Sequence, residues 1–327
     1  MKRTKQRLGI YTVLLFLLIA AVVATRTLAL LWNFNFETGY FEDKLFSSVS
    51  DWLTVVGVLL SLSYFAVGRS ARLRASFSSP AFYLPSGLLG VSLLFLAGDK
   101  LKAVFTGIYE NLYLGFGAFK PELILPFAVA VSALLAVGYF VLAPFTAHRL
   151  YLKRAALGIA VAVFLALYTA YLYFDTTLPL NAPMKVGSEM AFVFSSAFFL
   201  FETRISLGRD KWGAYLGFGM AAMLLTAAAS VPALIIYLSE GRLVAESLTE
   251  TVLLLSLFIF TSARVLHTLA LRVDGKAPLA ALAEKMTERE DTVAESSDTA
   301  EEKSDDEGVD EPDNYTMTFD EGEAKEI

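Results

Sequence analysis

Long apolar runs alternate with short polar loops over the first 272 residues of the chain. A helix needs ~20 mostly apolar residues to cross a bilayer, because the hydrocarbon core is ~30 Å thick and a helix rises ~1.5 Å per residue. The pattern therefore predicts an all-α fold, a polytopic membrane helix bundle with eight transmembrane helices. The eight segments are 8–31, 52–68, 79–98, 123–145, 155–174, 186–204, 212–238 and 248–271.

Basic residues follow the order of these segments. Cytoplasmic loops of membrane proteins carry an excess of Lys and Arg. Here the N-terminus and every second loop are rich in them, whereas the alternate loops are poor, except the loop around Lys100, Lys102 and Lys120. The alternation holds only if all eight segments span, and it then places both termini in the cytoplasm.

The N-terminal segment leaves one alternative open. A basic start, an apolar run and small residues at 21–24 also resemble a signal peptide. The apolar run continues past Arg26 and is long for a signal peptide. We therefore expect an uncleaved first helix; cleavage would leave seven spans.

Charge divides the chain into two parts. Residues 1–272 contain 22 Lys and Arg against 14 Asp and Glu, a net charge of +8, whereas residues 273–327 contain 5 against 19, a net charge of −14. Acidic segments of this composition cannot bury enough apolar surface to fold. We expect an acidic, largely disordered cytoplasmic tail. Its small hydrophobic stretch from Tyr315 to Phe319 is either a chance feature or a motif for a cytoplasmic partner protein.

Composition also excludes several kinds of chemistry. The chain has no cysteine and two histidines, so disulfides, thiol catalysis and Cys-ligated metals are excluded and a multi-histidine metal site is disfavoured. No nucleotide-binding or catalytic motif of the common classes is present. We expect no cofactor, no metal and no nucleic-acid partner, and an intramembrane enzyme using Asp99 and Glu189 is the least favoured function.

Two outer loops have patterns of their own. Aromatic and acidic residues alternate around Gly39 in 33–43, which is typical of an interfacial aromatic belt with a turn, or alternatively of an outer lid. Apolar residues at i, i+3, i+4 and i+7 spacing predict an amphipathic helix over 100–113, lying on the membrane surface or covering an outer cavity.

Ionisable residues inside the predicted spans are the candidate functional residues, because burying them in lipid is costly. Sorting them by depth gives an outer layer and an inner layer. The outer layer is a candidate polar cavity for a small solute or ion, formed by Arg26, Asp99, Lys100, Asp175, Glu189 and Ser196.

Glu189 lies about one turn inside the sixth span, on the same face as Ser196. It is either paired with Arg26 in a structural salt bridge, or it is a proton- or solute-binding carboxylate in a water-filled cavity. In the inner layer, Glu202 and Arg264 either extend to the nearby cytoplasmic interface or pair with each other and hold the sixth and eighth helices together.

Small residues at every fourth position mark the seventh segment. Gly213, Gly217 and Ala221 let another helix approach closely. The seventh helix is therefore either interior or a homodimer contact.

Three features together resemble a group of uncharacterised multi-spanning membrane proteins from anaerobic gut Firmicutes. They are the basic N-terminus running into the first helix, the element Phe36-Glu-Thr-Gly-Tyr40, and the region with Phe198-Phe-Leu-Phe-Glu-Thr-Arg204 followed by Leu207-Gly-Arg-Asp-Lys211. The resemblance implies a multi-pass protein of a bacterial plasma membrane and no particular activity.

The sequence therefore supports two functions almost equally. The first is binding or transport of a small solute through an outward-facing polar cavity. The second is a non-catalytic membrane scaffold or sensor that acts through the acidic tail. The lipid bilayer is a partner in either case. A small solute or ion is a partner under the first function, and a cytoplasmic protein is a partner under the second.

Overall fold

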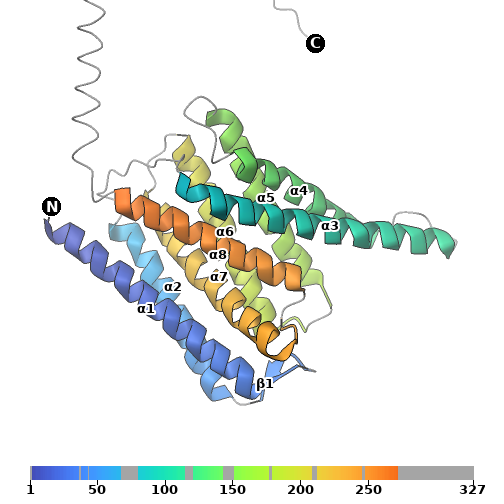
Figure 1. Ribbon diagram of the computed structural model, residues 1–327, viewed down its shortest axis with the longest axis horizontal. Coiled ribbons are helices and arrows are strands. Elements are labelled where there is room, and N and C mark those ends of the chain that lie inside the picture. Colours follow the sequence, from blue (N-terminus) through green and yellow to red (C-terminus); the bar gives the residue numbers. More distant parts are fainter. Residues whose placement is uncertain are drawn as a thin grey trace, which may run out of the picture. The chain divides into compact units, whose positions relative to one another are not determined.

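The computed structural model describes residues 2–36, 38–42, 44–67, 80–114, 121–142, 151–176, 179–207, 212–244 and 247–271. The acidic tail and its stretch from Tyr315 to Phe319 lie outside these residues. The described part is almost entirely helical (Figure 1). Its elements are α1 (Lys2–Asn33), β1 (Phe34–Asn35), β2 (Tyr40–Phe41), α2 (Lys44–Val67), η2 (Pro80–Phe82), α3 (Tyr83–Tyr113), η3 (Pro121–Leu123), α4 (Ile124–Leu142), α5 (Tyr151–Phe174), α6 (Pro183–Ser206), α7 (Trp212–Glu240) and α8 (Leu248–Leu271).

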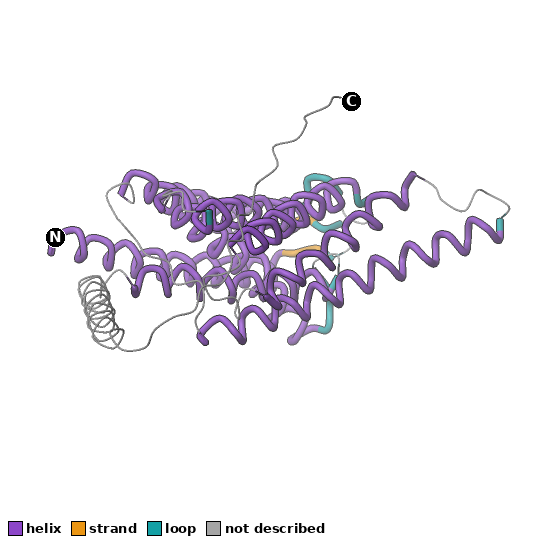
Figure 2. Tube along the Cα trace, turned by 90° about the horizontal axis from the view of Figure 1, so that it is seen from above, coloured by secondary structure: helices purple, strands orange, loops and turns teal. Residues whose placement is uncertain are grey.

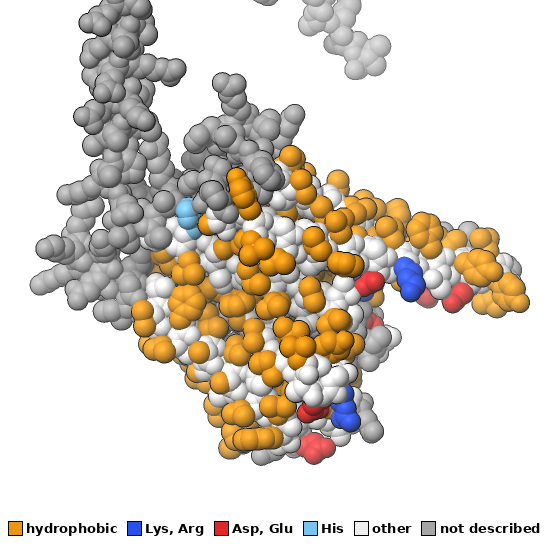
Figure 3. Space-filling view, viewed as in Figure 1, with side chains coloured by type: hydrophobic (Ala, Val, Ile, Leu, Met, Phe, Trp, Pro, Cys, Tyr) orange, Lys and Arg blue, Asp and Glu red, His pale blue; other side chains and the backbone are white. Residues whose placement is uncertain are grey.

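Seven of the eight α-helices in the described residues are long and apolar enough to cross a membrane. Large apolar side chains such as Leu59, Leu84 and Phe95 are more than 60% exposed. Figure 3 shows one face covered mostly by hydrophobic side chains, with the charged ones confined to its edges. An apolar surface of this extent needs a lipid environment. The chain is therefore a multi-pass integral membrane protein.

The exception among the helices is α3, whose second half carries Asp99, Lys100 and Lys102. The predicted amphipathic helix over 100–113 is helical, but it continues the preceding segment instead of forming a separate helix (Figure 2). The reason is that one buried face runs through the junction, from Leu96 through Lys100 to Val104. At ~1.5 Å per residue the helix is about 46 Å long, longer than a bilayer core.

Helices α3 to α8 form what we call the six-helix ring. Each packs against the next in the chain, and α8 closes the ring by packing against α3. Helices α1 and α2 pack against each other and against α7, outside the ring (Figure 1). As a result α7 has neighbours on all sides. Its small residues Gly213, Gly217 and Ala221 are buried within the chain, which favours the interior role over a homodimer contact.

A short hairpin follows α1. Strand β1 pairs antiparallel with β2, and Gly39 provides the predicted turn with a φ of +74°, which favours glycine. Phe34, Phe36 and Phe41 pack on a small apolar cluster formed by α1, α6, α7 and the segment after α7. Three of the four aromatic residues of this loop are thus packed against protein, whereas Tyr40 is exposed.

The close approach of α7 to its neighbours can be tested at Gly219. A Cβ there would lie 2.7 Å from Val265 Cγ2 and 3.0 Å from Phe198 Cδ2, two side chains with little freedom to move. We predict that Gly219→Ala lowers the thermal unfolding midpoint in detergent, at a cost of about 1–3 kcal/mol.

The matched control is Gly98→Ala, because a Cβ at Gly98 meets nothing within 4 Å. Alanine is favoured over glycine in a helix by roughly 0.5–1 kcal/mol, so this variant should be as stable as the parent or slightly more so. Equal destabilisation by both variants would contradict the close packing of α7.

Candidate functional site

A buried ion pair joins α6 to α8 inside the six-helix ring. Arg264 pairs with Glu202, and the two side chains are only 4% and 1% exposed. Helices α6 and α8 scarcely touch, because α7 lies between them in the ring. The structure thus brings together the two residues expected to pair, and the pair spans the ring interior.

Other elements supply polar and aromatic groups around this pair. Tyr215 of α7 hydrogen-bonds with Thr268 of α8 and, like Tyr139 of α4, acts electrostatically on Arg264. The ring of Phe82 lies 4.5 Å from the Arg264 guanidinium carbon, a distance suited to a cation–π interaction. We call this group, together with Glu202, the Glu202–Arg264 centre.

The centre retains unused hydrogen-bonding capacity. Oε2 of Glu202 is buried and has no hydrogen-bond partner among the described residues. His267 lies edge-on to Phe82 with ring centroids 4.9 Å apart, and its Nε2 is also buried without a partner in the part of the chain described. Buried polar atoms without partners are costly, so they mark places where a proton, water or solute can bind.

A second charged group lies inside the ring, towards the opposite end. Lys100 of α3 is 8% exposed, and its ammonium lies 3.8 Å from the ring centroid of Tyr171 and 5.8 Å from that of Tyr168, both on α5. Because α4 separates α3 from α5 in the ring, Lys100 must reach across the interior.

Glu250 of α8 lies at the same height in the ring as Lys100. It is 2% exposed. Its neighbour Thr249 donates a hydrogen bond to Asp99, the neighbour of Lys100, and this bond fixes the register of α8 against α3. Lys100 and Glu250 are therefore buried at one height in the ring, and with Tyr168 and Tyr171 they form the Lys100 centre.

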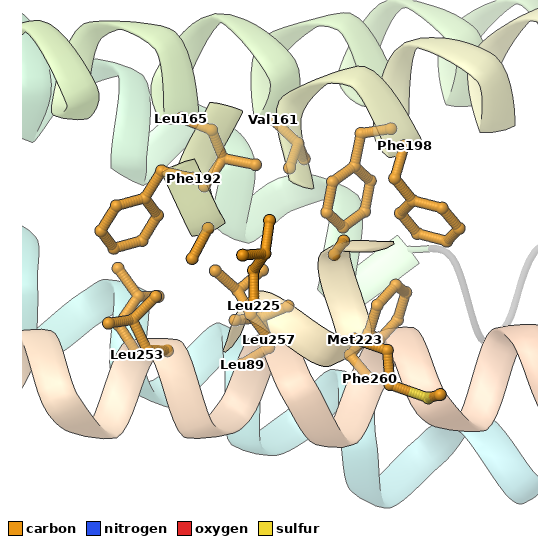
Figure 4. Packing of buried hydrophobic residues seen from close by; sticks show 14 of the residues in the cluster. Leu89, Val161, Leu165, Phe192, Phe198, Met223, Leu225, Leu253, Leu257 and Phe260 are labelled. Carbon is orange, nitrogen blue, oxygen red and sulfur yellow. The ribbon is translucent and has the colours of Figure 1, made fainter. Parts of the chain in front are cut away.

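An apolar layer separates the two centres. Leu165 and Phe192 from one side of the ring point toward Leu253 and Leu257 from the other (Figure 4). Arg264 follows Glu250 by 14 positions in α8, so the centres are about 21 Å apart along the helix.

The structure places each of the six residues expected to line one outer cavity against its own neighbours. Lys100 lies inside the ring, whereas Asp99 is exposed and accepts a hydrogen bond from Thr249. Ser196 donates to the carbonyl of Ala162 on α5 at 2.9 Å. The backbone carbonyl of Asp175, near the end of α5, accepts a hydrogen bond from Lys185 Nζ at 2.6 Å.

Arg26 and Glu189 do not pair in the described part of the chain, so the salt bridge, one of the two alternatives for Glu189, is not formed. The ion pair that Arg26 makes is with Asp51 of α2, 3.8 Å away, instead of with Glu189. Glu189 is partly buried on α6, and its Oε1 has no hydrogen-bond partner among the described residues. The sequence pattern does not indicate Asp51, because the second apolar segment starts after it, whereas α2 begins at Lys44.

Comparisons with family models, with curated proteins and with solved structures find no match to this chain. The assignment of a site therefore depends on the geometry alone. Within the described residues no group of three or more His, Cys, Asp or Glu could hold a metal ion. The two centres inside the ring are the strongest candidates, because each collects buried charged and polar groups from at least three helices.

The ion pair of the Glu202–Arg264 centre can be tested by breaking it and by replacing it. Glu202→Gln or Arg264→Gln alone should destabilise the protein by about 3–5 kcal/mol, because each leaves one buried charge without its partner. The double variant Glu202→Leu with Arg264→Met removes both charges and should recover most of the loss. Unfolding in detergent measures this.

Arg204→Gln is the matched control, since Arg204 is exposed on the same end of α6 and should tolerate the change. If the double variant loses as much unfolding free energy as the two single variants together, the pair does not act as a unit.

Proposed function

We propose that this protein binds a small polar solute inside the six-helix ring and moves it across the membrane. In this proposal all eight helices span a bacterial plasma membrane, both termini are cytoplasmic, and the Lys100 centre faces outward. The orientation follows from the distribution of Lys and Arg among the loops. The length of α3 supports the eighth span, because the helix is long enough to cross the bilayer and continue beyond it.

One observation carries the proposal. Two buried charged centres lie inside one closed ring of helices and are separated by an apolar layer. Ionisable residues within a membrane are costly, and they mark substrate, ion or proton pathways by default. A purely structural ion pair explains one centre, but it does not explain why both lie in the interior shared by all six helices.

The chemistry of the centres indicates how a solute would be held. In the Lys100 centre, a carboxylate, an ammonium group and two tyrosine rings can bind a solute by charge and by stacking. In the Glu202–Arg264 centre, the free Oε2 of Glu202 can take up a proton or accept a hydrogen bond. The apolar layer keeps water from running continuously from one centre to the other.

A scaffold or sensor that acts through the acidic tail is the second candidate. The packed apolar layer inside the ring favours it, because a bundle that only supports a tail needs no polar path. Under this alternative, deletion of residues 290–327 would abolish recovery of a partner protein, while changes at Lys100 or Glu250 would not affect it.

The solute proposal predicts ligand-induced stabilisation that depends on the Lys100 centre. Purified protein is heated with glycine, glutamate, succinate, choline, glucose and uridine, which represent zwitterionic, anionic, cationic and neutral solutes. At least one of them should raise the unfolding midpoint of the parent protein. The shift should disappear in Lys100→Met and in Glu250→Gln, because each variant leaves a ligand group without its partner.

Lys102→Met and Glu110→Gln are the matched controls, since both side chains are exposed on α3 and should leave the shift unchanged. No shift with any of the six solutes, or a shift that survives both ring variants, would contradict the proposal.

A further inference from the structure

Another buried charge lies outside the ring, where α1, α2 and the start of α6 meet. Arg26 of α1 is 6% exposed. Its Nη2 donates a hydrogen bond to the carbonyl of Pro183 at 3.0 Å and lies 3.7 Å from the sulfur of Met184. The guanidinium is thus directed at the first turn of α6.

The positive charge of Arg26 is only partly compensated. The carboxylate oxygen Oδ1 of Asp51 lies 3.8 Å from Nη1, which is too long for a hydrogen bond. The Asp51 side chain is 63% exposed, so water screens its charge. Nε of Arg26 is buried and has no hydrogen-bond partner among the described residues.

A second buried donor at this height also has no partner. Ser50 of α2 is 1% exposed, and its Oγ makes no hydrogen bond in the part of the chain described. Thr12 of α1 contacts Tyr64 of α2, and Gly57 of α2 lies against Leu18 of α1. This antiparallel register places Ser50 at the height of Arg26.

The first turn of α6 adds a third source of positive potential. Ala182 at the N-cap provides no side-chain hydrogen bond to the first turn. The unpaired N–H groups of a helix start attract negative charge. Gly187 keeps this turn open to Arg26, because a Cβ there would lie 3.0 Å from Nη2. Nearby Lys185 donates its hydrogen bonds to carbonyls at the end of α5, away from this charge.

From these groups we infer that the junction of α1, α2 and α6 binds a small monovalent anion. Nε of Arg26 and the Ser50 hydroxyl are the donors, and the α6 N-terminus adds its positive potential. The ligand is either an inorganic anion such as chloride or the carboxylate of a small organic molecule. This inference is independent of the solute site inside the ring.

The test measures unfolding midpoints of the full chain in detergent. Chloride or acetate is increased at constant ionic strength against gluconate, a larger anion. We expect saturable stabilisation by chloride, by acetate or by both. The anion that binds more tightly shows whether the site takes an inorganic anion or a carboxylate. Ser50→Ala should weaken this binding about tenfold, because it removes one hydrogen bond to a charged ligand.

Asp51→Asn is a variant that should strengthen anion binding instead of weakening it. If the anion competes with Asp51 for Arg26, removing the carboxylate should tighten binding about tenfold or more, whereas a merely structural ion pair gives no dependence on the anion. Arg26→Gln should abolish the dependence, and Arg242→Gln, at an exposed arginine after α7, should retain it.

If Arg26→Gln does not fold, Ser50→Ala and Asp51→Asn decide the question, since Ser50 is small and Asp51 is exposed. Absence of a saturable effect of both anions in the parent and in Asp51→Asn would overturn the inference. An effect that Ser50→Ala leaves unchanged would also overturn it.

Discussion

A charge inside a bilayer must meet an opposite charge or a polar partner, because leaving it alone costs ~2.5–3.5 kcal/mol even on insertion scales. The pair of Glu202 and Arg264 satisfies this constraint across the ring interior. Helices α6 and α8 cannot rotate or separate without exposing a bare charge to apolar surroundings. Phe82 covers Arg264, so the start of α3 is fixed to the same pair.

The other buried cations meet the constraint in different ways. Lys185 uses the carbonyls at the end of α5, and Lys100 uses the faces of two tyrosine rings. Arg26 has one close carbonyl and a distant, exposed carboxylate. The polar groups that hold the helices together therefore leave some hydrogen-bonding capacity unused, and both proposed binding sites use this capacity.

Much of the fold could be predicted from the sequence, because hydrophobic runs long enough to span are the strongest pattern in the chain. Glu202 and Arg264 could be predicted to pair, since both lie near the same ends of parallel helices. The outer residues could not be grouped correctly, because depth along a helix says nothing about which neighbour a side chain faces. Glu250, at the start of α8, is indicated only by its burial in the folded chain.

If the protein carries a solute through the ring, the two centres reach water from opposite sides of the membrane. Because the chain has no cysteine, single cysteines can be labelled without background. A membrane-impermeant thiol reagent should modify Ala97→Cys, beside the Lys100 centre, only from outside, and Thr268→Cys only from the cytoplasmic side. Ala136→Cys in the apolar layer should react from neither side. If neither Ala97→Cys nor Thr268→Cys reacts from any side, the ring interior is a sealed structural core and the account is wrong.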